Sequence, residues 1–238
     1  MIEIERSSKI EKSLKMKTEK PSHREKGLLS ILSKPWAYDL FIKLVAKKRT
    51  RVGLFQNYVR PFPGCRILEI GCGTASRLSY LPDSIGEYAG FDMNPLYIES
   101  ARKRWRGRVN CRFFCQRVED AEILETEYYD IVLAFGIVHH LSDNEATYLF
   151  NLAYHALKLN GALITYDNVF VENQDRLAKW FISRDRGRAV RTAEGYKRLA
   201  LRHFVDIESD VLHDVLRIPY TSFIMRCIKR SSTKERSS

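Results

Sequence analysis

The chain has 238 residues, of which 45% are hydrophobic and 11% aromatic, and this is enough to form the core of one domain with appendages. No run of about 18 apolar residues occurs and the charged N-terminus lacks the apolar stretch of a secretory signal, so we expect a cytoplasmic protein without a membrane span. The formal net charge of +11 suits an anionic partner, such as nucleic acid, a small anion or a membrane surface, but solubility alone explains it equally well.

The charge is distributed unevenly along the chain. Residues 61–175 hold 10 Lys and Arg against 16 Asp and Glu, whereas residues 176–238 hold 15 against 7. Residues 1–60 are also basic. An acidic middle region is therefore flanked by two basic ones.

The five cysteines predict buried, reduced thiols. Their number is odd, no C-x-x-C pair occurs, and most of them lie in strand-like runs. We therefore expect neither a disulfide framework nor a metal site.

The first 60 residues predict an arm followed by helices. Residues 1–26 are highly charged, and residues 35–60 carry apolar residues at helical spacing, which indicates one or two amphipathic helices. Trp36 and Tyr38 could close over a ligand, or they could be core residues of such a helix.

Strands and helices alternate from residue 61 onward. Strands are predicted at residues 65–70, 87–92, 109–115, 129–135 and 162–170. Asn94 and Pro95 begin a helix that ends near Trp105, because Asn is a good cap and Pro suits the first helical turn. Ser142 and Glu145 form a capping-box pattern that opens another helix. This alternation predicts an α/β fold with a parallel, doubly wound sheet and helices on both faces.

The pattern changes after residue 170. Asn160 and Gly161 predict a turn into the strand that precedes this change. Residues 171–190 and 192–204 are predicted to be helical, and strands follow at 205–214 and 220–228. Two strands joined by a short link without a helix must be antiparallel neighbours.

We expect a single domain over residues 27–230, after a basic arm at 1–26 and before a tail at 231–238. The parts of this domain are N-terminal helices at 27–60, a ligand-binding core at 61–170, a helical lid or substrate segment at 171–204 and a terminal strand pair at 205–230.

A strand in the stretch RILEIGCGTASRL, residues 66–78, runs directly into two glycines, Gly71 and Gly73. Glycine adopts positive φ and lets a ligand approach the backbone, and a helix after the glycines would direct N–H groups at an anion. Asp92 ends the next strand, 21 residues after Gly71, where it can accept hydrogen bonds from ribose hydroxyls. Together these features predict a nucleoside ligand.

The residues around the glycines narrow the choice among nucleoside ligands. A dinucleotide fingerprint requires Gly or Ala where this chain has Ser76. Glu69 beneath the loop would repel a pyrophosphate but would attract an ammonium group. A ligand with an amino group, a carboxylate and an adenosine fits all of these features, and S-adenosylmethionine is such a molecule.

Four segments of the chain resemble successive motifs of the class I S-adenosylmethionine-dependent methyltransferases. They are ILEIGCGTA, YAGFDMNP, YYDIVLAFGIVHHL and ALKLNGALITYDNV, within about residues 61–168. The resemblance implies a Rossmann-like, seven-stranded, mostly parallel sheet that ends in an antiparallel strand pair.

The resemblance also implies a set of cofactor-binding residues. Around the methionine part of the cofactor it places Glu69, Gly71, Cys72 and Gly73, around the ribose Asp92, and around the adenine Met93, Val118 and Glu119. Phe135 is a further predicted cofactor-binding residue. Many members have Gly-Asp where this chain has Gln116-Arg117, so Glu119 or a backbone carbonyl could contact the adenine amino group instead.

Methyl transfer from a sulfonium depends mainly on in-line placement of the acceptor, and a general base helps when the acceptor must lose a proton. By the resemblance His139 and His140 follow the fourth strand beside the acceptor pocket, with His139 more often facing it. We predict His139 as the catalytic residue and His140 as a substrate contact, although both could be structural.

Basic residues late in the chain could bind the acceptor. Arg184, Arg186, Arg188 and Arg191 precede the last helix, where this fold commonly builds a substrate lid, and they could bind phosphate or carboxylate. A solvated basic face explains them equally well. Arg217 and Tyr220 open the final strand and could also reach the pocket.

The leading hypothesis is a methyltransferase for a small or medium-sized metabolite, with anionic metabolites among the candidates. An RNA methyltransferase is the alternative that the basic flanks favour, although no RNA-binding module is evident. A fold of this type that binds a ligand or partner without chemistry is more remote, because suitable residues fill all the predicted cofactor positions.

Overall fold

The computed structural model describes residues 47–120, 125–172, 174–176, 178–179, 189–213, 215, 217 and 220–231. The predictions for the arm at 1–26, for Trp36 and Tyr38, and for the arginines at 184, 186 and 188 lie outside these residues. In the part of the chain described, no helix is long and apolar enough to cross a membrane.

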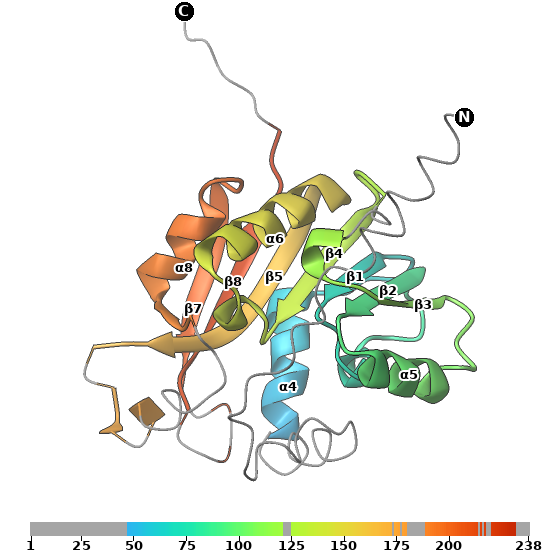
Figure 1. Ribbon diagram of the computed structural model, residues 1–238, viewed down its shortest axis with the longest axis horizontal. Coiled ribbons are helices and arrows are strands. Elements are labelled where there is room, and N and C mark those ends of the chain that lie inside the picture. The colour runs from blue at the N-terminus through green and yellow to red at the C-terminus, as the bar shows by residue number, and fades with distance from the viewer. Residues whose placement is uncertain are drawn as a thin grey trace, which may run out of the picture.

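The structure is built on one mixed β-sheet with the strand order β3-β2-β1-β4-β5-β8-β7 (Figure 1). The strands are β1 (Arg66–Ile70), β2 (Glu87–Asp92), β3 (Cys111–Cys115), β4 (Tyr129–Phe135), β5 (Leu157–Phe170), β7 (Asp206–Leu212) and β8 (Ser222–Ile228). The first five strands are parallel, whereas β8 lies antiparallel between β5 and β7. The predicted α/β fold and its antiparallel strand pair are therefore confirmed.

Helices cover both faces of this sheet, and each face has its own hydrophobic core. On one face α6 (Asp143–Ala156) and α8 (Ala193–Ala200) bury side chains such as Phe150 and Tyr196 against the strands. On the other face α4 (Lys48–Leu54) and α5 (Pro95–Arg104) pack with Phe55 and Ile98. Two cores with one sheet between them are the expected result of a doubly wound chain.

The predicted helix starts are confirmed by their caps. The Asn94 side chain accepts a hydrogen bond from the Leu96 N–H, and Pro95 is the first residue of α5. The Ser142 side chain accepts from the Glu145 N–H, while the Glu145 carboxylate accepts from the Ser142 N–H. These local bonds satisfy N–H groups that the first helical turn leaves without partners.

Several elements differ from the predictions. The segment after the glycine loop is a short 3₁₀-helix, η2 (Ser76–Tyr80), and no α-helix forms there. Leu81 after it is extended, as expected for a residue that precedes proline. A two-residue strand that was not predicted, β6 (Arg191–Thr192), pairs with the end of β5.

The N-terminal helical segment combines two helix types. Helix α4 continues into a π-helix, η1 (Phe55–Val59), which ends where Arg60 adopts a left-handed conformation with φ of 53°. Both elements lie within the range predicted to be helical. The Arg226 guanidinium donates to the Tyr58 carbonyl, so this segment is bound to β8.

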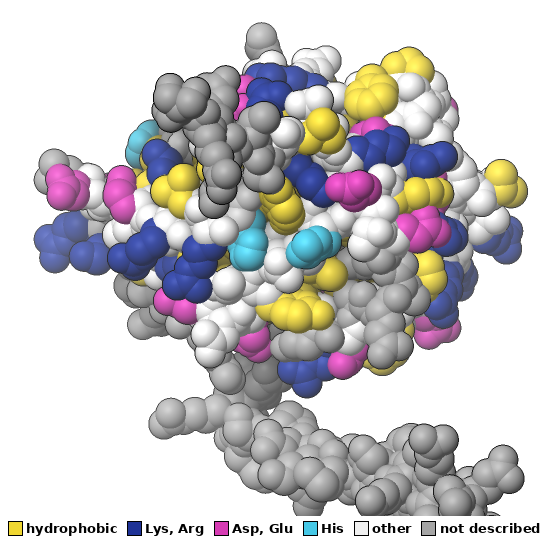
Figure 2. Space-filling view, turned by 90° about the horizontal axis from the view of Figure 1, so that it is seen from above, with side chains coloured by type: hydrophobic (Ala, Val, Ile, Leu, Met, Phe, Trp, Pro, Cys, Tyr) yellow, Lys and Arg dark blue, Asp and Glu magenta, His cyan; other side chains and the backbone are white. Residues whose placement is uncertain are grey.

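The cysteines form no disulfide in the structure. All five are free, with Cys65, Cys72 and Cys227 buried, Cys111 half-buried and Cys115 exposed. Figure 2 shows a face on which Lys and Arg side chains are interspersed with acidic and apolar ones.

Candidate active site

Two glycines end the two central parallel strands. Gly71 follows β1 with φ of 69°, and Gly136 follows β4 with φ of 71°. Strand β1 pairs with β2 on one side and β4 on the other, so the chain leaves the carboxyl ends of β1 and β4 in different directions. Ligands of open parallel sheets bind in the crevice that this reversal creates.

The two glycines of the predicted cofactor loop have different surroundings. A β-carbon on Gly71 would lie 2.7 Å from Ile137 Cδ1, so this glycine allows two loops to touch. A β-carbon on Gly73, where φ is 57°, would meet nothing within 4 Å. Open space beside a backbone with positive φ is what a closely approaching ligand requires.

Asp92 connects the end of β2 to this loop. Its Oδ2 accepts a hydrogen bond from the Gly73 N–H at 3.0 Å, and its Oδ1 accepts one from the Asn94 N–H at 2.8 Å. Burial raises the pKa of Asp92, and these two bonds oppose the rise. The loop and the predicted ribose-binding carboxylate are therefore one connected unit.

The charge of Glu69 is balanced within the protein. Glu69 is fully buried, and its two carboxylate oxygens bind the Arg77 guanidinium and the Tyr88 hydroxyl. The Arg77 guanidinium also donates to the Gly71 carbonyl at 3.1 Å. Burial raises the pKa of Tyr88 well above its usual value, with the nearby Glu69 carboxylate as the next cause, so Tyr88 remains a donor. A direct contact between Glu69 and a ligand ammonium group stays a prediction. In the structure, the Arg77 guanidinium already binds the Glu69 carboxylate.

The other predicted cofactor residues lie around the same edge. Met93 directly follows Asp92 and is 68% exposed, Val118 is buried at the start of η3 (Val118–Asp120), and Phe135 is buried at the end of β4. Cys72 is buried in the loop, where burial raises the pKa of its thiol well above the usual value. The side chain of Glu119 lies outside the described residues.

The predicted catalytic residue, His139, forms a pair with a carboxylate on β5. His139 lies in η4 (Val138–His140) directly after β4, and its Nδ1 is 2.7 Å from Asp167 Oδ1. The backbone N–H of His139 donates to the same oxygen at 3.1 Å. His139 is 5% exposed and Asp167 is 3% exposed, so the pair is almost completely buried.

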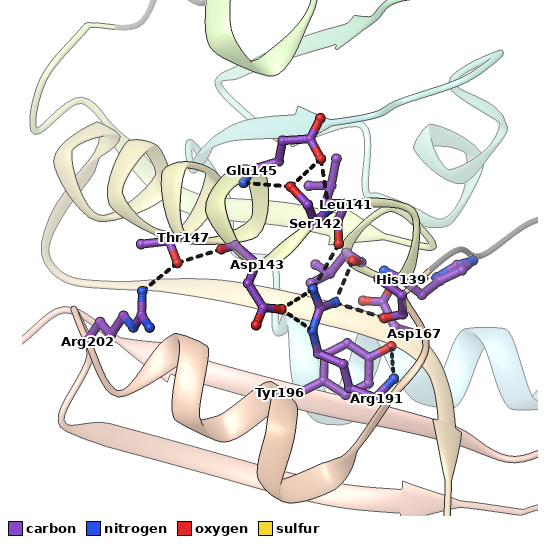
Figure 3. A network of polar contacts seen from close by, with 12 residues as sticks. His139, Leu141, Ser142, Asp143, Glu145, Thr147, Asp167, Arg191, Tyr196 and Arg202 are labelled. Atoms are coloured by element: carbon purple, nitrogen blue, oxygen red, sulfur yellow. Dashed lines mark hydrogen bonds and ion pairs between the residues drawn. The ribbon is translucent and has the colours of Figure 1, made fainter.

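Arg191 holds the His139 segment in place (Figure 3). Its guanidinium donates to the Val138 carbonyl at 3.1 Å and to the Leu141 carbonyl at 2.9 Å, on either side of the two histidines. It also forms an ion pair with Asp143, the first residue of α6. A predicted substrate arginine thus fixes the loop that carries the predicted base.

The remaining predicted substrate residues lie in different environments. The His140 ring is exposed and lies beside the His139 ring, with ring centroids 4.1 Å apart. Arg217 is exposed and Tyr220 is half-buried. The side chains of Arg186 and Arg188 lie outside the described residues, so their role in a lid stays a prediction.

An aromatic row leads away from the end of β4. The Phe135 ring lies 6.0 Å from Phe55 and 5.7 Å from Tyr166, and Phe55 lies 5.5 Å from Tyr80, between ring centroids. These rings join β4 and β5 to the N-terminal helical segment. Phe55 and Phe135 are part of the hydrophobic core on the α4 and α5 face of the sheet, and Tyr80 and Tyr166 pack against it.

Sequence reasoning did not assign a role to Arg77, Gly136 or Asp167, and it considered Arg191 only as a possible substrate contact. Gly136 follows a hydrophobic strand in the same way as Gly71, and this signal could have found it. Asp167 stands within the apolar stretch ALITYDNVF, where a carboxylate needs a reason to be buried.

Comparison with known proteins shows that the central region is similar to methyltransferase domains. Residues 67–161 match the family model described as a methyltransferase domain. A protein named as a probable nonribosomal peptide synthetase, CymA of Salinispora arenicola, is 32% identical over 87 residues, and highly reducing polyketide synthase 2 of Gibberella zeae is 29% identical over 139 residues. The matches cover 34% and 51% of this chain, but the chain spans only 1% and 5% of those proteins.

A solved structure shows the same fold. Phosphoethanolamine N-methyltransferase 2 of Haemonchus contortus, in complex with phosphomonomethylethanolamine and S-adenosylhomocysteine, has a TM-score of 0.68 at 15% identity. The similarity covers 83% of this chain and 57% of that one. The Rossmann-like fold expected from the sequence is therefore confirmed.

Proposed function

We propose that this chain transfers a methyl group from S-adenosylmethionine to a small or medium-sized metabolite, because residues 67–161 match a methyltransferase-domain model and the fold is that of a solved methyltransferase. The acceptor atom is oxygen, nitrogen or carbon, and anionic metabolites are the favoured class. The observation that carries the proposal is the glycine loop with open space at Gly73, bound to the Asp92 carboxylate.

The residues present fit this cofactor. Gly73 leaves room for a ligand against the backbone, and each Asp92 oxygen accepts one backbone N–H and keeps a further lone pair for a ribose hydroxyl. Exposed Met93 stands next to Asp92, where an adenine ring would lie. Phe135, at the carboxyl end of β4, would supply an apolar side chain near the cofactor.

In this reaction the cofactor carries the activated methyl group, so the protein acts mainly by positioning the acceptor. S-adenosylmethionine, when bound, supplies a methyl group on a positively charged sulfur that leaves as a neutral thioether. The protein must align the acceptor and exclude water, which lowers the barrier through positioning. His139 lies at the carboxyl end of β4, where it would accept the proton of an acceptor hydroxyl or amine.

Two observations favour a small acceptor over RNA. On the face in Figure 2, the described residues mix basic and acidic side chains and form no continuous basic stripe of the kind expected for an RNA-binding surface. The curated relatives are named as peptide and polyketide synthases, and the structural neighbour holds a small phosphorylated amine. An anionic acceptor would suit the basic C-terminal region of the chain, residues 176–238. Cytoplasmic location is part of the same proposal.

The experiment compares two carboxylates at opposite ends of the sheet. Asp92 ends β2, whereas Asp130 lies near the start of β4 and accepts the Arg66 N–H at 2.8 Å. Both carboxylates accept a backbone N–H, but only Asp92 lies at the cofactor edge. Asp92→Asn should weaken binding of S-adenosylhomocysteine by about 2 kcal/mol, or roughly thirtyfold in Kd, because hydrogen bonds to a charged group are lost.

Isothermal titration calorimetry measures both variants. Asp130→Asn should bind S-adenosylhomocysteine as the wild type does. The proposal fails if the wild type does not bind this ligand, or if Asp92→Asn binds it with unchanged affinity.

A further inference from the structure

We propose that Trp105 is a positioning residue for the cofactor loop. Its indole N–H holds Ala75 in a left-handed conformation, and this conformation keeps the Gly73 backbone open to the ligand. The inference rests on the proposed binding of S-adenosylmethionine. It assigns a function to a tryptophan that lies 30 residues after Ala75, at the end of α5.

Ala75 has an unusual backbone for a residue with a side chain. It lies two residues after Gly73 in the loop, and its φ is 52°. An L-residue is disfavoured in this left-handed region, because its β-carbon comes too close to the following carbonyl oxygen. Such strain persists only where the surrounding structure fixes the residue, and it is concentrated at ligand-binding loops. The contacts of Ala75 therefore decide whether the loop keeps this shape.

Both backbone polar groups of Ala75 form hydrogen bonds, and one partner is Trp105. The Ala75 N–H donates to the Cys72 carbonyl at 2.9 Å, and the Ala75 carbonyl accepts the Leu78 N–H at 3.2 Å. The same carbonyl, which has two lone pairs, also accepts the indole Nε1–H of Trp105 at 3.1 Å. Cys72 and Leu78 belong to the same stretch of chain as Ala75, whereas Trp105 joins the turn to α5.

Two arginines beside Trp105 support this contact. The Arg104 guanidinium donates to the carbonyl and the hydroxyl oxygen of Thr74, both at 3.2 Å. The Arg108 guanidinium lies over the Trp105 ring, 5.8 Å from its centroid, and donates to the Pro82 carbonyl at 3.3 Å. The end of α5 therefore binds the chain both before and after η2, which fixes the place of the indole ring.

The start of the same segment holds the other end of the loop. Asp92 Oδ2 accepts the Gly73 N–H at 3.0 Å, so residues 92–105 bind the loop at Gly73 and again at Ala75. Only Thr74 separates these two points, so the direction of the Gly73 backbone depends on the conformation of Ala75. A β-carbon on Gly73 would meet nothing within 4 Å, and this is the space that the cofactor needs.

Loss of the indole N–H should therefore lower the affinity for the ligand. Without this bond, the free protein would relieve the strain at Ala75 by a change in the turn. Binding of the ligand would then have to restore the left-handed conformation, and the cost would appear in Kd. A tryptophan that only fills space would change the stability of the fold and leave Kd unchanged.

Calorimetric titration and thermal unfolding of Trp105→Phe separate these two roles, because Phe keeps an aromatic ring and removes the N–H donor. The affinity for S-adenosylhomocysteine should fall about fivefold, the equivalent of one neutral hydrogen bond. Tyr128→Phe is the matched control, since it keeps the ring and removes a hydroxyl that donates to Glu87 Oε2 at 2.7 Å. Tyr128 directly precedes β4, so this control should bind the ligand as the wild type does. Unchanged affinity in a folded Trp105→Phe protein overturns the proposal.

A second change tests the strain at Ala75 directly. Glycine adopts the left-handed conformation without the penalty of a β-carbon, so Ala75→Gly should recover part of the affinity lost in the Trp105→Phe protein. This change cannot replace the lost volume of the indole ring, so recovery assigns the effect to the backbone. A double variant that recovers no affinity contradicts the role of Trp105 in holding Ala75.

NMR of the indole groups tests the contact in the wild-type protein, even if Trp105→Phe does not fold. The chain has three tryptophans, and resonance assignment identifies the Nε1–H signal of Trp105 among them. Without ligand, this N–H should exchange with water at least about tenfold more slowly than in free tryptophan, because it is hydrogen-bonded. Saturation with S-adenosylhomocysteine should shift the signal, since the ligand contacts the loop that accepts the bond. Fast exchange, or a signal that bound ligand does not shift, overturns the proposal.

Binding by the wild type separates this inference from the proposed function. If the wild type and Trp105→Phe bind S-adenosylhomocysteine equally well, the role of Trp105 is contradicted and methyl transfer stands. If the wild type has a slowly exchanging Trp105 N–H but does not bind the ligand, methyl transfer is contradicted, and with it any role of Trp105 in cofactor binding.

Discussion

Gly73→Ala is the sharpest test of the cofactor loop, because it adds one methyl group and removes no hydrogen bond. The Gly73 N–H donates to Asp92 Oδ2, and alanine keeps that donor. The added β-carbon meets no protein atom within 4 Å, so only a bound ligand would resist it. Loss of binding in this variant would therefore show where the ligand lies.

The backbone cost can be measured separately. An L-residue at φ of 57° costs about 1 kcal/mol relative to glycine, which lowers Tm by about 2–4 °C in a chain of this size. Gly64 offers a matched control. Its φ is 78°, a β-carbon there also meets nothing within 4 Å, and its N–H donates to the Ser84 carbonyl. Gly64 precedes β1, at the amino end of the sheet.

Calorimetric titration with S-adenosylhomocysteine and thermal unfolding give the two measurements. Both Gly73→Ala and Gly64→Ala should lose the same few degrees of Tm. Only Gly73→Ala should lose affinity, by at least tenfold, which is about 1.4 kcal/mol. Equal affinity losses in both variants, or an unaffected Gly73→Ala, would refute the placement of the ligand against this loop.

Two further predictions concern stability. Gly71→Ala should lower Tm more than Gly73→Ala, because its β-carbon would lie 2.7 Å from Ile137 Cδ1, and a second change, Ile137→Ala, should recover part of the loss in thermal unfolding. The hydrogen bond and charge of Arg191 lower the pKa of the Asp143 carboxyl in the folded protein. The ion pair therefore stabilises the fold fully above the pKa of Asp in the unfolded chain, about 3.9, and this stabilisation is lost as the pH falls through the lower pKa of the folded protein. Asp143→Asn should therefore be less stable than wild type near neutral pH, by under about 1 kcal/mol for so exposed a carboxylate, and equally stable near pH 2 in urea titrations.

Features set by nearby residues were predictable from the sequence. The caps at Asn94 and Ser142 depend on side chains that bond to N–H groups two or three residues away. The positive φ at Gly71 follows from a strand that must stop within one residue. In each case the structure depends on a few residues that are adjacent in the sequence, so the local sequence pattern is enough to predict it.

Features set by packing were not predictable in the same way. Asn160 and Gly161 predict a turn, but both lie within β5, where Asn160 has φ of 63° and the pairing with β4 shifts register. A β-carbon on Gly161 would lie 3.0 Å from the Asp130 carbonyl, so the neighbouring strand requires glycine there. These residues interrupt the pairing of β5 with β4, because Leu157 pairs with Tyr129 and pairing resumes only at Ala162 opposite Ile131.

The buried contact between His139 and Asp167 shows the same limit at the site. His139 and Asp167 are 28 residues apart, and only the adjacent position of β4 and β5 brings them together. Sequence reasoning placed His139 after the fourth strand from a resemblance but had no means to pair it. An unexplained carboxylate in an apolar strand is the signal to search for such a partner.

The contact between Gly71 and Ile137 joins the two halves of the site. Gly71 belongs to the loop that would hold the methyl donor, and Ile137 lies between Gly136 and the η4 turn that carries His139. Because the Ile137 side chain occupies the space where a β-carbon of Gly71 would be, the loops after β1 and β4 pack directly on each other. The packing of one side chain against one glycine therefore helps to fix the position of His139 relative to the loop after β1. A larger residue at position 71 would move His139 as well as the cofactor loop, so its effect on catalysis should exceed its effect on cofactor binding.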